Sequence, residues 1–206
     1  MNPPTTATAQ NPPPARPSAW LSWLWRWEAR LKGVEFQGSC VFEGRPLIRK
    51  ARGARIRIGD GVRISKADFI GLAQPSVLNA LVPGASLELE RGVTLCGAVL
   101  CVSTVIAIGP GAVLGAGSMV LDNDFHAPVG EWDWSEDFQT RARPIRIGRH
   151  VVVGAKAIIL KGVTIGDAAL IEAGAVVTRD VPAGHIARGN PAACEPGNGL
   201  TTDKHL

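Results

Sequence analysis

The segment DNDFHAPVGEWDW, residues 122–134, contains the side chains of this sequence that are best suited to chemistry. At its centre is His126, with carboxylates on both sides. Unperturbed histidine titrates near neutrality, so it suits removal of a proton by general-base catalysis, which contributes roughly 10²–10⁴-fold to a rate. A carboxylate on the other ring nitrogen would fix the tautomer; Asp124 and Asp122 are both candidates, and a backbone carbonyl would serve as well. The alternative interpretation is that His126 is a solvated residue of a surface loop.

This segment interrupts a pattern in which an aliphatic residue recurs at every sixth position. A period of six is neither the 3.6 of an α-helix nor the plain alternation of a strand. A short strand followed by a turn accounts for it, with one large and one small inward side chain on each flat face. In the clearest block, the first positions are Ile147, Val153, Ile159, Ile165, Ile171 and Val177, and the fifth positions are Val151, Ala157, Val163, Ala169, Ala175 and Val181.

The same register recurs earlier in the chain, at Ile58, Ile64, Ile70, Leu89, Leu95, Ile108, Leu114 and Val120. The frame slips between residues 71 and 86 and around residues 101–107, where we expect irregular coils. The repeats therefore predict a regular scaffold, and residues 122–143 are predicted to leave it as a loop.

The repeats resemble those of the hexapeptide-repeat acyltransferases, most closely the branch of maltose, galactoside and nodulation-factor acetyltransferases. The resemblance covers roughly residues 38–192 and is most specific over RPIRIGRHVVVGAKAIILKGVTIGDAALIEAGAVVTRDVPAGHIARGNPA, residues 143–192. It implies an all-β domain, a left-handed parallel β-helix built as a triangular solenoid, with one protruding catalytic loop. The left hand comes from the resemblance, because a period of six does not set a hand.

The resemblance also implies roles for individual residues. The pattern DFHAP, followed downstream by RPIRIG, places the family's catalytic histidine on His126. Acetyl-CoA would be the acyl donor, with its pantetheine arm along the coils between two subunits of a homotrimer and with no metal required. The coenzyme contacts implied by the motifs are Gly154, Ala155, Lys161, Ala173, Gly174, Thr178, Arg179 and Arg188. For each glycine the alternative is a coil corner, and for each basic side chain it is a solvated face.

Three aromatic residues of the predicted loop, Trp132, Trp134 and Phe138, have two interpretations. Their faces could pack on the C–H surface of a sugar ring and so bind the acceptor. They could equally be apolar pegs that fix a long loop to a neighbouring subunit.

The amino-terminal part of the chain differs from the repeats. Residues 1–18 are predicted to be a disordered Pro-rich tail, and residues 19–37 a Trp-rich amphipathic helix. The apolar stripe of this helix consists of Trp20, Trp23, Leu24, Trp27 and Leu31. One interpretation is a helix that caps the end of the main domain. The other is weak anchoring at a membrane surface, where Trp favours the headgroup region and Arg16, Arg26, Arg30 and Lys32 could meet anionic lipid.

Composition sets the remaining limits. The 206 residues suit one domain, followed at residues 193–206 by a carboxy-terminal tail. The net charge of +4 fits an anionic small molecule or an acidic membrane as the partner. Nucleic acid is disfavoured, because aromatic and basic residues are not interleaved along the sequence. Four cysteines without CxxC spacing predict free thiols in a reducing compartment. No run approaches a membrane-spanning length and no secretory signal is evident, so we expect a cytoplasmic location, with the inner membrane face as an option.

The resemblance, taken with these observations, implies an acetyl-CoA-dependent O-acetyltransferase that modifies a sugar or glycan intermediate, as in polysaccharide biosynthesis, with His126 as general base. One alternative is N-acetylation of an amino sugar, and another is a catalytically silent β-helix scaffold. A metal enzyme of the γ-carbonic anhydrase type is disfavoured, because His126 and His150 are isolated and no His-x4-His pair is present.

Overall fold

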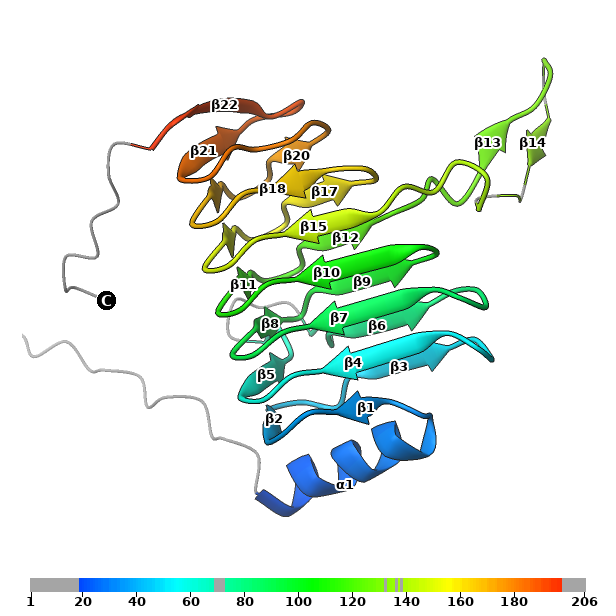
Figure 1. The fold of residues 1–206 in the computed structure, drawn as a ribbon, viewed down its shortest axis with the longest axis vertical. Helices are drawn as coiled ribbons and strands as arrows, with labels where there is room; N and C mark the ends of the chain where they lie inside the picture. Colours follow the sequence, from blue (N-terminus) through cyan, green and yellow to red (C-terminus); the bar gives the residue numbers. More distant parts are fainter. Residues whose placement is uncertain (1–18, 69–72, 132, 136, 138, 198–206) are drawn as a thin grey trace, which may run out of the picture.

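The computed structural model describes residues 19–68, 73–131, 133–135, 137 and 139–197. The chain visits three sheets in turn, one strand at a time, and so winds into a stack of three-sided coils, which Figure 1 shows from the side. All pairings within these sheets are parallel except that of β21 with β22. Sheet A consists of β1 (Glu35–Phe36), β4 (Arg55–Ile58), β7 (Ser86–Leu89), β10 (Val105–Ile108), β15 (Ile145–Ile147) and β18 (Thr164–Ile165). Sheet B consists of β2 (Cys40–Phe42), β5 (Val62–Ser65), β8 (Thr94–Cys96), β11 (Val113–Leu114), β16 (Val152–Val153), β19 (Leu170–Ile171), β21 (His185–Arg188) and β22 (Ala193–Pro196). Sheet C consists of β3 (Leu47–Lys50), β6 (Val77–Ala80), β9 (Val99–Val102), β12 (Met119–Leu121), β17 (Ile158–Leu160) and β20 (Val176–Val177).

The six-residue period describes the interior of this stack correctly. Every first and fifth position of the block from Ile147 to Val181 is buried, and successive first positions lie on sheets A, B and C in turn. In-register pairing stacks these side chains along the axis, as in the sheet C series Leu78, Leu100, Val120 and Ile159. The interior is therefore a continuous column of aliphatic side chains. Ile70 lies outside the described residues.

At the places where the six-residue period shifts register, the corners between strands differ in length, whereas the strands keep their parallel pairing. Around residues 101–107 the predicted irregular coil is absent, because β9 and β10 keep their parallel pairing on both sides of a short corner at Ser103 and Thr104. Between residues 71 and 86 the prediction of an irregular coil is wrong for residues 77–80, which form β6 in regular parallel pairing with β3 and β9.

The outward faces of the sheets differ in chemistry. On sheet C, one outward ladder is entirely apolar and half-buried to exposed: Leu47, Val77, Val99, Met119, Ile158 and Val176. On sheet A, the equivalent ladder through Arg57, Glu88, Ala107, Arg146 and Thr164 is largely charged or polar. Sheet A therefore suits solvent, whereas sheet C suits contact with another protein surface.

Both ends of the stack are covered by the chain itself. Helix α1 (Ala19–Leu31) lies across the first coil, and β22 folds back antiparallel on β21 at the last (Figure 1). The Ser22 hydroxyl accepts a hydrogen bond from Phe42 N at 3.0 Å, and Ala29 is buried. Each cover protects backbone groups that would otherwise be an open edge.

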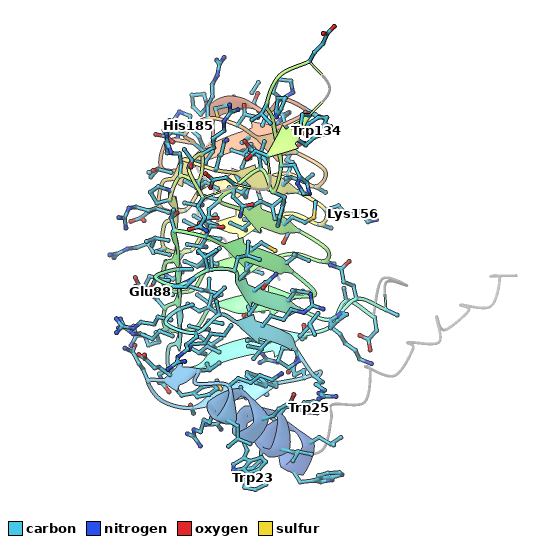
Figure 2. All side chains as sticks on the ribbon, turned by 90° about the vertical axis from the view of Figure 1, so that its right-hand side faces the viewer. Trp23, Trp25, Glu88, Trp134, Lys156 and His185 are labelled. Atoms are coloured by element: carbon cyan, nitrogen blue, oxygen red, sulfur yellow. The ribbon has the colours of Figure 1, made fainter. Side chains whose placement is uncertain are left out.

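The predicted stripe of α1 faces away from the coils. Trp20, Trp23 and Trp27 are 64%, 63% and 49% exposed, and Leu24 and Leu31 are exposed as well. Figure 2 shows Trp23 beyond the helix, pointing away from the stack. The helix caps the domain with its opposite face, which is built on Ser22, Trp25 and Ala29, so the apolar stripe does not form the capping contact.

All four cysteines are unpaired thiols, as predicted. Cys40 and Cys101 are buried, and burial raises the pKa of each thiol.

Candidate functional site

A buried polar network fixes the base of the loop that carries His126. Asp122 is fully buried, and its carboxylate accepts hydrogen bonds from Ser103 N, Thr104 N and the Thr104 hydroxyl. The neighbouring Asn123 is also buried and donates from Nδ2 to the Ser103 hydroxyl and to Asp122. The returning end of the loop is held at the same point, because Arg143 N donates to the Asp122 carbonyl at 2.9 Å. The loop therefore leaves and rejoins the stack at one rigid position.

Sequence reasoning treated Asp122 as a possible partner of His126 and missed Asn123, Ser103 and Thr104. In the structure both Asp122 oxygens are taken up by the corner between β9 and β10. The signal that could have revealed this network was the frame slip around residues 101–107. The slip marks the two-residue corner, Ser103 and Thr104, whose N–H groups donate hydrogen bonds to the Asp122 carboxylate.

A strained turn presents His126 immediately after this base. Phe125 has a φ of 61°, and His126 N donates to the Asp124 carbonyl at 2.6 Å, which makes a tight three-residue γ-turn. Asn123 holds the turn by accepting from Phe125 N at 2.9 Å. A positive φ at a bulky residue persists only where its surroundings impose it, and such residues cluster at functional sites.

The side chain of His126 is not engaged by the described part of the protein. The residue is exposed, and its ring makes no hydrogen bond with any residue that the structure describes. Asp124 is exposed too, and its carboxylate forms an ion pair with Lys161, from the corner that follows β17 on the next coil. The structure thus brings together Asp124 and Lys161, which the sequence had assigned to different tasks. It leaves the His126 ring accessible to a substrate.

Beyond His126 the loop forms a small hairpin. Strand β13 (Ala127–Pro128) pairs antiparallel with β14 (Trp134–Ser135), and the hairpin projects from the side of the stack (Figure 1). Trp134 is 65% exposed, with no aromatic partner among the described residues. Trp132 and Phe138 lie outside the described residues. Trp134 is thus available either to a sugar ring or to a neighbouring subunit.

The residues implied in coenzyme binding lie along two edges of the triangular prism and on sheet B. Gly154, Ala155, Ala173 and Gly174 follow β16 and β19, at the edge between sheets B and C. They are stacked, with Gly174 N donating to the Ala155 carbonyl at 2.9 Å. Lys161, Thr178 and Arg179 follow β17 and β20, at the edge between sheets C and A that also carries the His126 loop. Arg188 ends β21 on sheet B.

The two glycines serve different purposes in the coil. A Cβ at Gly154 would lie 2.5 Å from Ala173 N, so coil-to-coil packing by itself excludes a side chain there. Gly174 has a φ of 73° and open space around it, so it is required by a left-handed turn and leaves the backbone accessible.

The basic side chains in this set already have carboxylate partners, except for Arg179. Lys161 pairs with Asp124, and Arg188 pairs with Glu172 and Glu195. Arg179 is exposed and has no ion pair within the described part of the chain. A phosphate would therefore meet Arg179 without competition, whereas at Lys161 and Arg188 it would have to displace a carboxylate.

Over the described ranges, no group of three or more His, Cys, Asp or Glu side chains is arranged to hold a metal ion. In the same part of the chain, no helix combines the length and the hydropathy that crossing a bilayer requires.

Comparison with known sequences finds the repeats. The family model described as the hexapeptide repeat of succinyl-transferase matches residues 144–179. A 2,3,4,5-tetrahydropyridine-2,6-dicarboxylate N-acetyltransferase of Staphylococcus aureus is 51% identical over 51 residues, which are 25% of this chain and 21% of that protein. The chain therefore matches about a fifth of the length of such curated relatives, and the match does not extend to their other parts.

Comparison with solved structures covers most of the chain. AntD, an N-acyltransferase from Bacillus cereus in complex with dTDP and 3-hydroxybutyryl-CoA, matches with a TM-score of 0.64 and 19% identity, over 84% of this chain and 87% of that one. A hexapeptide-repeat acetyltransferase from Vibrio cholerae, complexed with acetyl coenzyme A, matches with a TM-score of 0.55 and 20% identity, over 88% and 80%. At this identity the likeness establishes the fold, and it confirms the predicted left-handed β-helix.

Proposed function

We propose that the chain is an acyltransferase of the hexapeptide-repeat type, and more narrowly an acetyl-CoA-dependent O-acetyltransferase acting on a hydroxyl of a sugar or glycan intermediate; the repeat match at residues 144–179 and the fold support this. The observation that carries the proposal is the loop at residues 122–143. A buried network anchors it to a β-helix of the acyltransferase type, and it presents one accessible imidazole, that of His126.

In the proposed reaction, His126 takes the proton of the acceptor hydroxyl as the oxygen attacks the thioester carbonyl. The new C–O bond forms, the C–S bond of the tetrahedral intermediate breaks, and the imidazolium returns its proton to the departing CoA thiolate. The γ-turn at Phe125 and the network under it would hold the ring still during these steps. The carboxylate beside this turn is that of Asp124, and we assign it the task of orienting the loop through Lys161.

We further propose that the active unit is a homotrimer with its sites between subunits. The apolar outward ladder of sheet C from Leu47 to Val176 would be covered by such an association, whereas the polar ladder of sheet A needs no cover. Sheet C also separates the stacked glycine and alanine edge from the His126 loop edge. A loop of one subunit could thus face the glycine and alanine edge of its neighbour across a single coenzyme. The cytoplasm, where acetyl-CoA is available, is the proposed location.

The second candidate is N-acylation of an amino sugar carried by a nucleotide. It is favoured by the similarity to AntD, an N-acyltransferase whose structures hold dTDP, CoA and dTDP-4-amino-4,6-dideoxyglucose. The curated relative from Staphylococcus aureus is also named as an N-acetyltransferase. His126 could remove a proton from an ammonium or amine in the same position, so the catalytic assignment is common to both candidates.

The decisive experiment is to measure acetyl-CoA turnover, with mass spectrometry of the products, against sugars, amino sugars and nucleotide sugars. The full chain and its His126→Ala variant are run in parallel. We expect acetylation of a hydroxyl-bearing acceptor and a fall of roughly 10²–10⁴-fold in kcat for the variant. Acetylation only of amino sugars would select the second candidate. An unchanged rate in His126→Ala would exclude His126 as the base, and a lack of both turnover and CoA binding would favour a silent scaffold.

A further inference from the structure

We propose that the α1 end of the molecule docks on an anionic lipid bilayer through the outward residues Trp20, Trp23, Leu24, Trp27 and Leu31, here called the outer stripe. This goes beyond the proposed chemistry and does not depend on it. The outer stripe spans eleven residue steps of the helix, about 16 Å at 1.5 Å per residue. All five of its side chains are exposed, and α1 is the outermost element of that end of the stack (Figure 2).

The helix is fixed so that the outer stripe cannot turn inward. On the opposite face, Glu28 forms ion pairs with Arg45 and Lys32, and Ser22 accepts from Phe42 N. The guanidinium groups of Arg26 and Arg30 lie 5.8 and 5.4 Å from the centre of the Phe36 ring. Arg26 and Arg30 thus hold the helix against the first coil through the Phe36 ring. The five apolar side chains of the outer stripe remain on the opposite, outward face of the helix.

The charge of the same end is strongly positive. Residues 19–68 hold eleven Lys and Arg against five Asp and Glu, a net charge of +6, although the whole chain has a net charge of +4. Arg49, Lys50 and Arg52, at and just after the end of β3, form no ion pair within the described residues. Each basic residue near an anionic membrane surface is worth about fivefold in binding.

These features together select a bilayer over a protein groove. Tryptophan, which supplies three of the five outer-stripe positions, favours the interface between headgroups and acyl chains. A rigid amphipathic helix with adjacent basic side chains is the arrangement that lies in this interface plane. A helix of thirteen residues binds only weakly by itself, so the basic side chains of the coils beside it would supply the remaining affinity.

The test is co-sedimentation of the full chain with vesicles of phosphatidylcholine alone and of phosphatidylcholine with 30% phosphatidylglycerol. We expect binding to the anionic vesicles, with weakening by salt. The double variant Trp23→Gln, Trp27→Gln should bind at least tenfold more weakly. The matched control is Trp134→Gln, which removes an equally exposed Trp at the far side of the stack and should bind as the native chain does. Replacement of Arg49, Lys50 and Arg52 by Gln should reduce binding to anionic vesicles only.

Two results would overturn the proposal. One is a lack of binding to either kind of vesicle, and the other is binding that the outer-stripe variants leave unchanged. Sedimentation velocity identifies the competing occupant: if the outer-stripe variants alter the oligomeric state and vesicles do not bind, the outer stripe contacts a second copy of this chain. The unfolding temperature of each variant is compared first, and we expect no change because the substituted side chains are exposed. Since vesicle binding is read without acetyl-CoA, failure here leaves the proposed chemistry standing.

Discussion

At the scale of single residues, the ion pair between Lys161 and Asp124 changes how the site is understood. The resemblance implied a coenzyme contact for Lys161, and the sequence left Asp124 as one of two candidate partners of the imidazole. The structure joins them across two coils, directly beside the turn that presents His126. Lys161 is therefore placed to hold the loop, and a phosphate would have to compete with a carboxylate for it.

We predict that Lys161→Met lowers kcat about tenfold and changes the KM for acetyl-CoA by less than about threefold, because the lost pair loosens the His126 loop. Lys161→Arg should restore most of kcat, since it can keep the pair. Steady-state kinetics with varied acetyl-CoA measures both parameters. A tenfold rise in KM with kcat unchanged would instead assign Lys161 to the coenzyme.

Asp122 is predicted to stabilise the folded protein as well as to position the loop. In Asp122→Asn an amide group would face the N–H donors of Ser103 and Thr104, so buried donors lose their charged acceptor. We expect a loss of about 2–4 kcal/mol in the free energy of unfolding. Urea unfolding followed by circular dichroism measures it. Asp133→Asn, on the exposed part of the loop, is the control and should change stability by less than about 0.5 kcal/mol; equal stabilities of the two variants would disprove the role given to Asp122.

At the scale of elements, the repeats were predictable and the orientation of α1 was not. A position such as Ile159 recurs in a frame of six and can face only the interior of the coil. The helix instead has two usable faces. Its larger apolar face, with Trp23 and Trp27, would have been the expected contact, but the face with Ser22 and Ala29 is the one that fits the first coil. That choice depends on Phe42 and Arg45, whose positions follow from the fold and not from the helix sequence.

The Glu28 ion pairs predict how acid affects this element. Hydrogen bonds from Arg45 and Lys32 lower the pKa of Glu28 from 4.5 to about 2. Because the pKa is lower in the folded state, the pairs stabilise the docked helix above pH 4.5, and this stabilisation is lost as the pH falls towards 2. Since the pairs are partly solvated, we expect Glu28→Gln to cost up to about 1 kcal/mol at pH 7 and less than half of that at pH 3.

Tryptophan fluorescence during urea unfolding is a suitable measurement, since four of the six Trp residues lie in α1. Glu131→Gln, on the exposed loop, is the control and should show little difference at either pH. A cost for Glu28→Gln that stays the same from pH 7 to pH 3 would contradict the assignment of the pKa shift to docking of the helix.

At the scale of the whole molecule, two of the three sides of the prism differ clearly in the chemistry of their outward side chains. Sheet A faces solvent, sheet C offers an apolar ladder for association, and the proposed site needs two edges that sheet C separates. None of this could be read from the order of residues alone. The six-residue period fixes which side chains point inward and does not specify how the outward side chains of successive coils combine. The proposed position of the site, between subunits, depends on that combination.

A mixing experiment tests this arrangement directly. His126→Ala removes the base from the loop edge, and Ala173→Trp blocks the glycine and alanine edge, where Ala173 is exposed. Each variant alone should be inactive. If each site takes its loop from one subunit and its glycine and alanine edge from the next, random mixing of the two chains by co-expression leaves about a quarter of the sites with both parts intact. We therefore expect about a quarter of the native kcat per site. Sites contained within single chains would give no recovery at any mixing ratio, because every chain would carry one of the two defects.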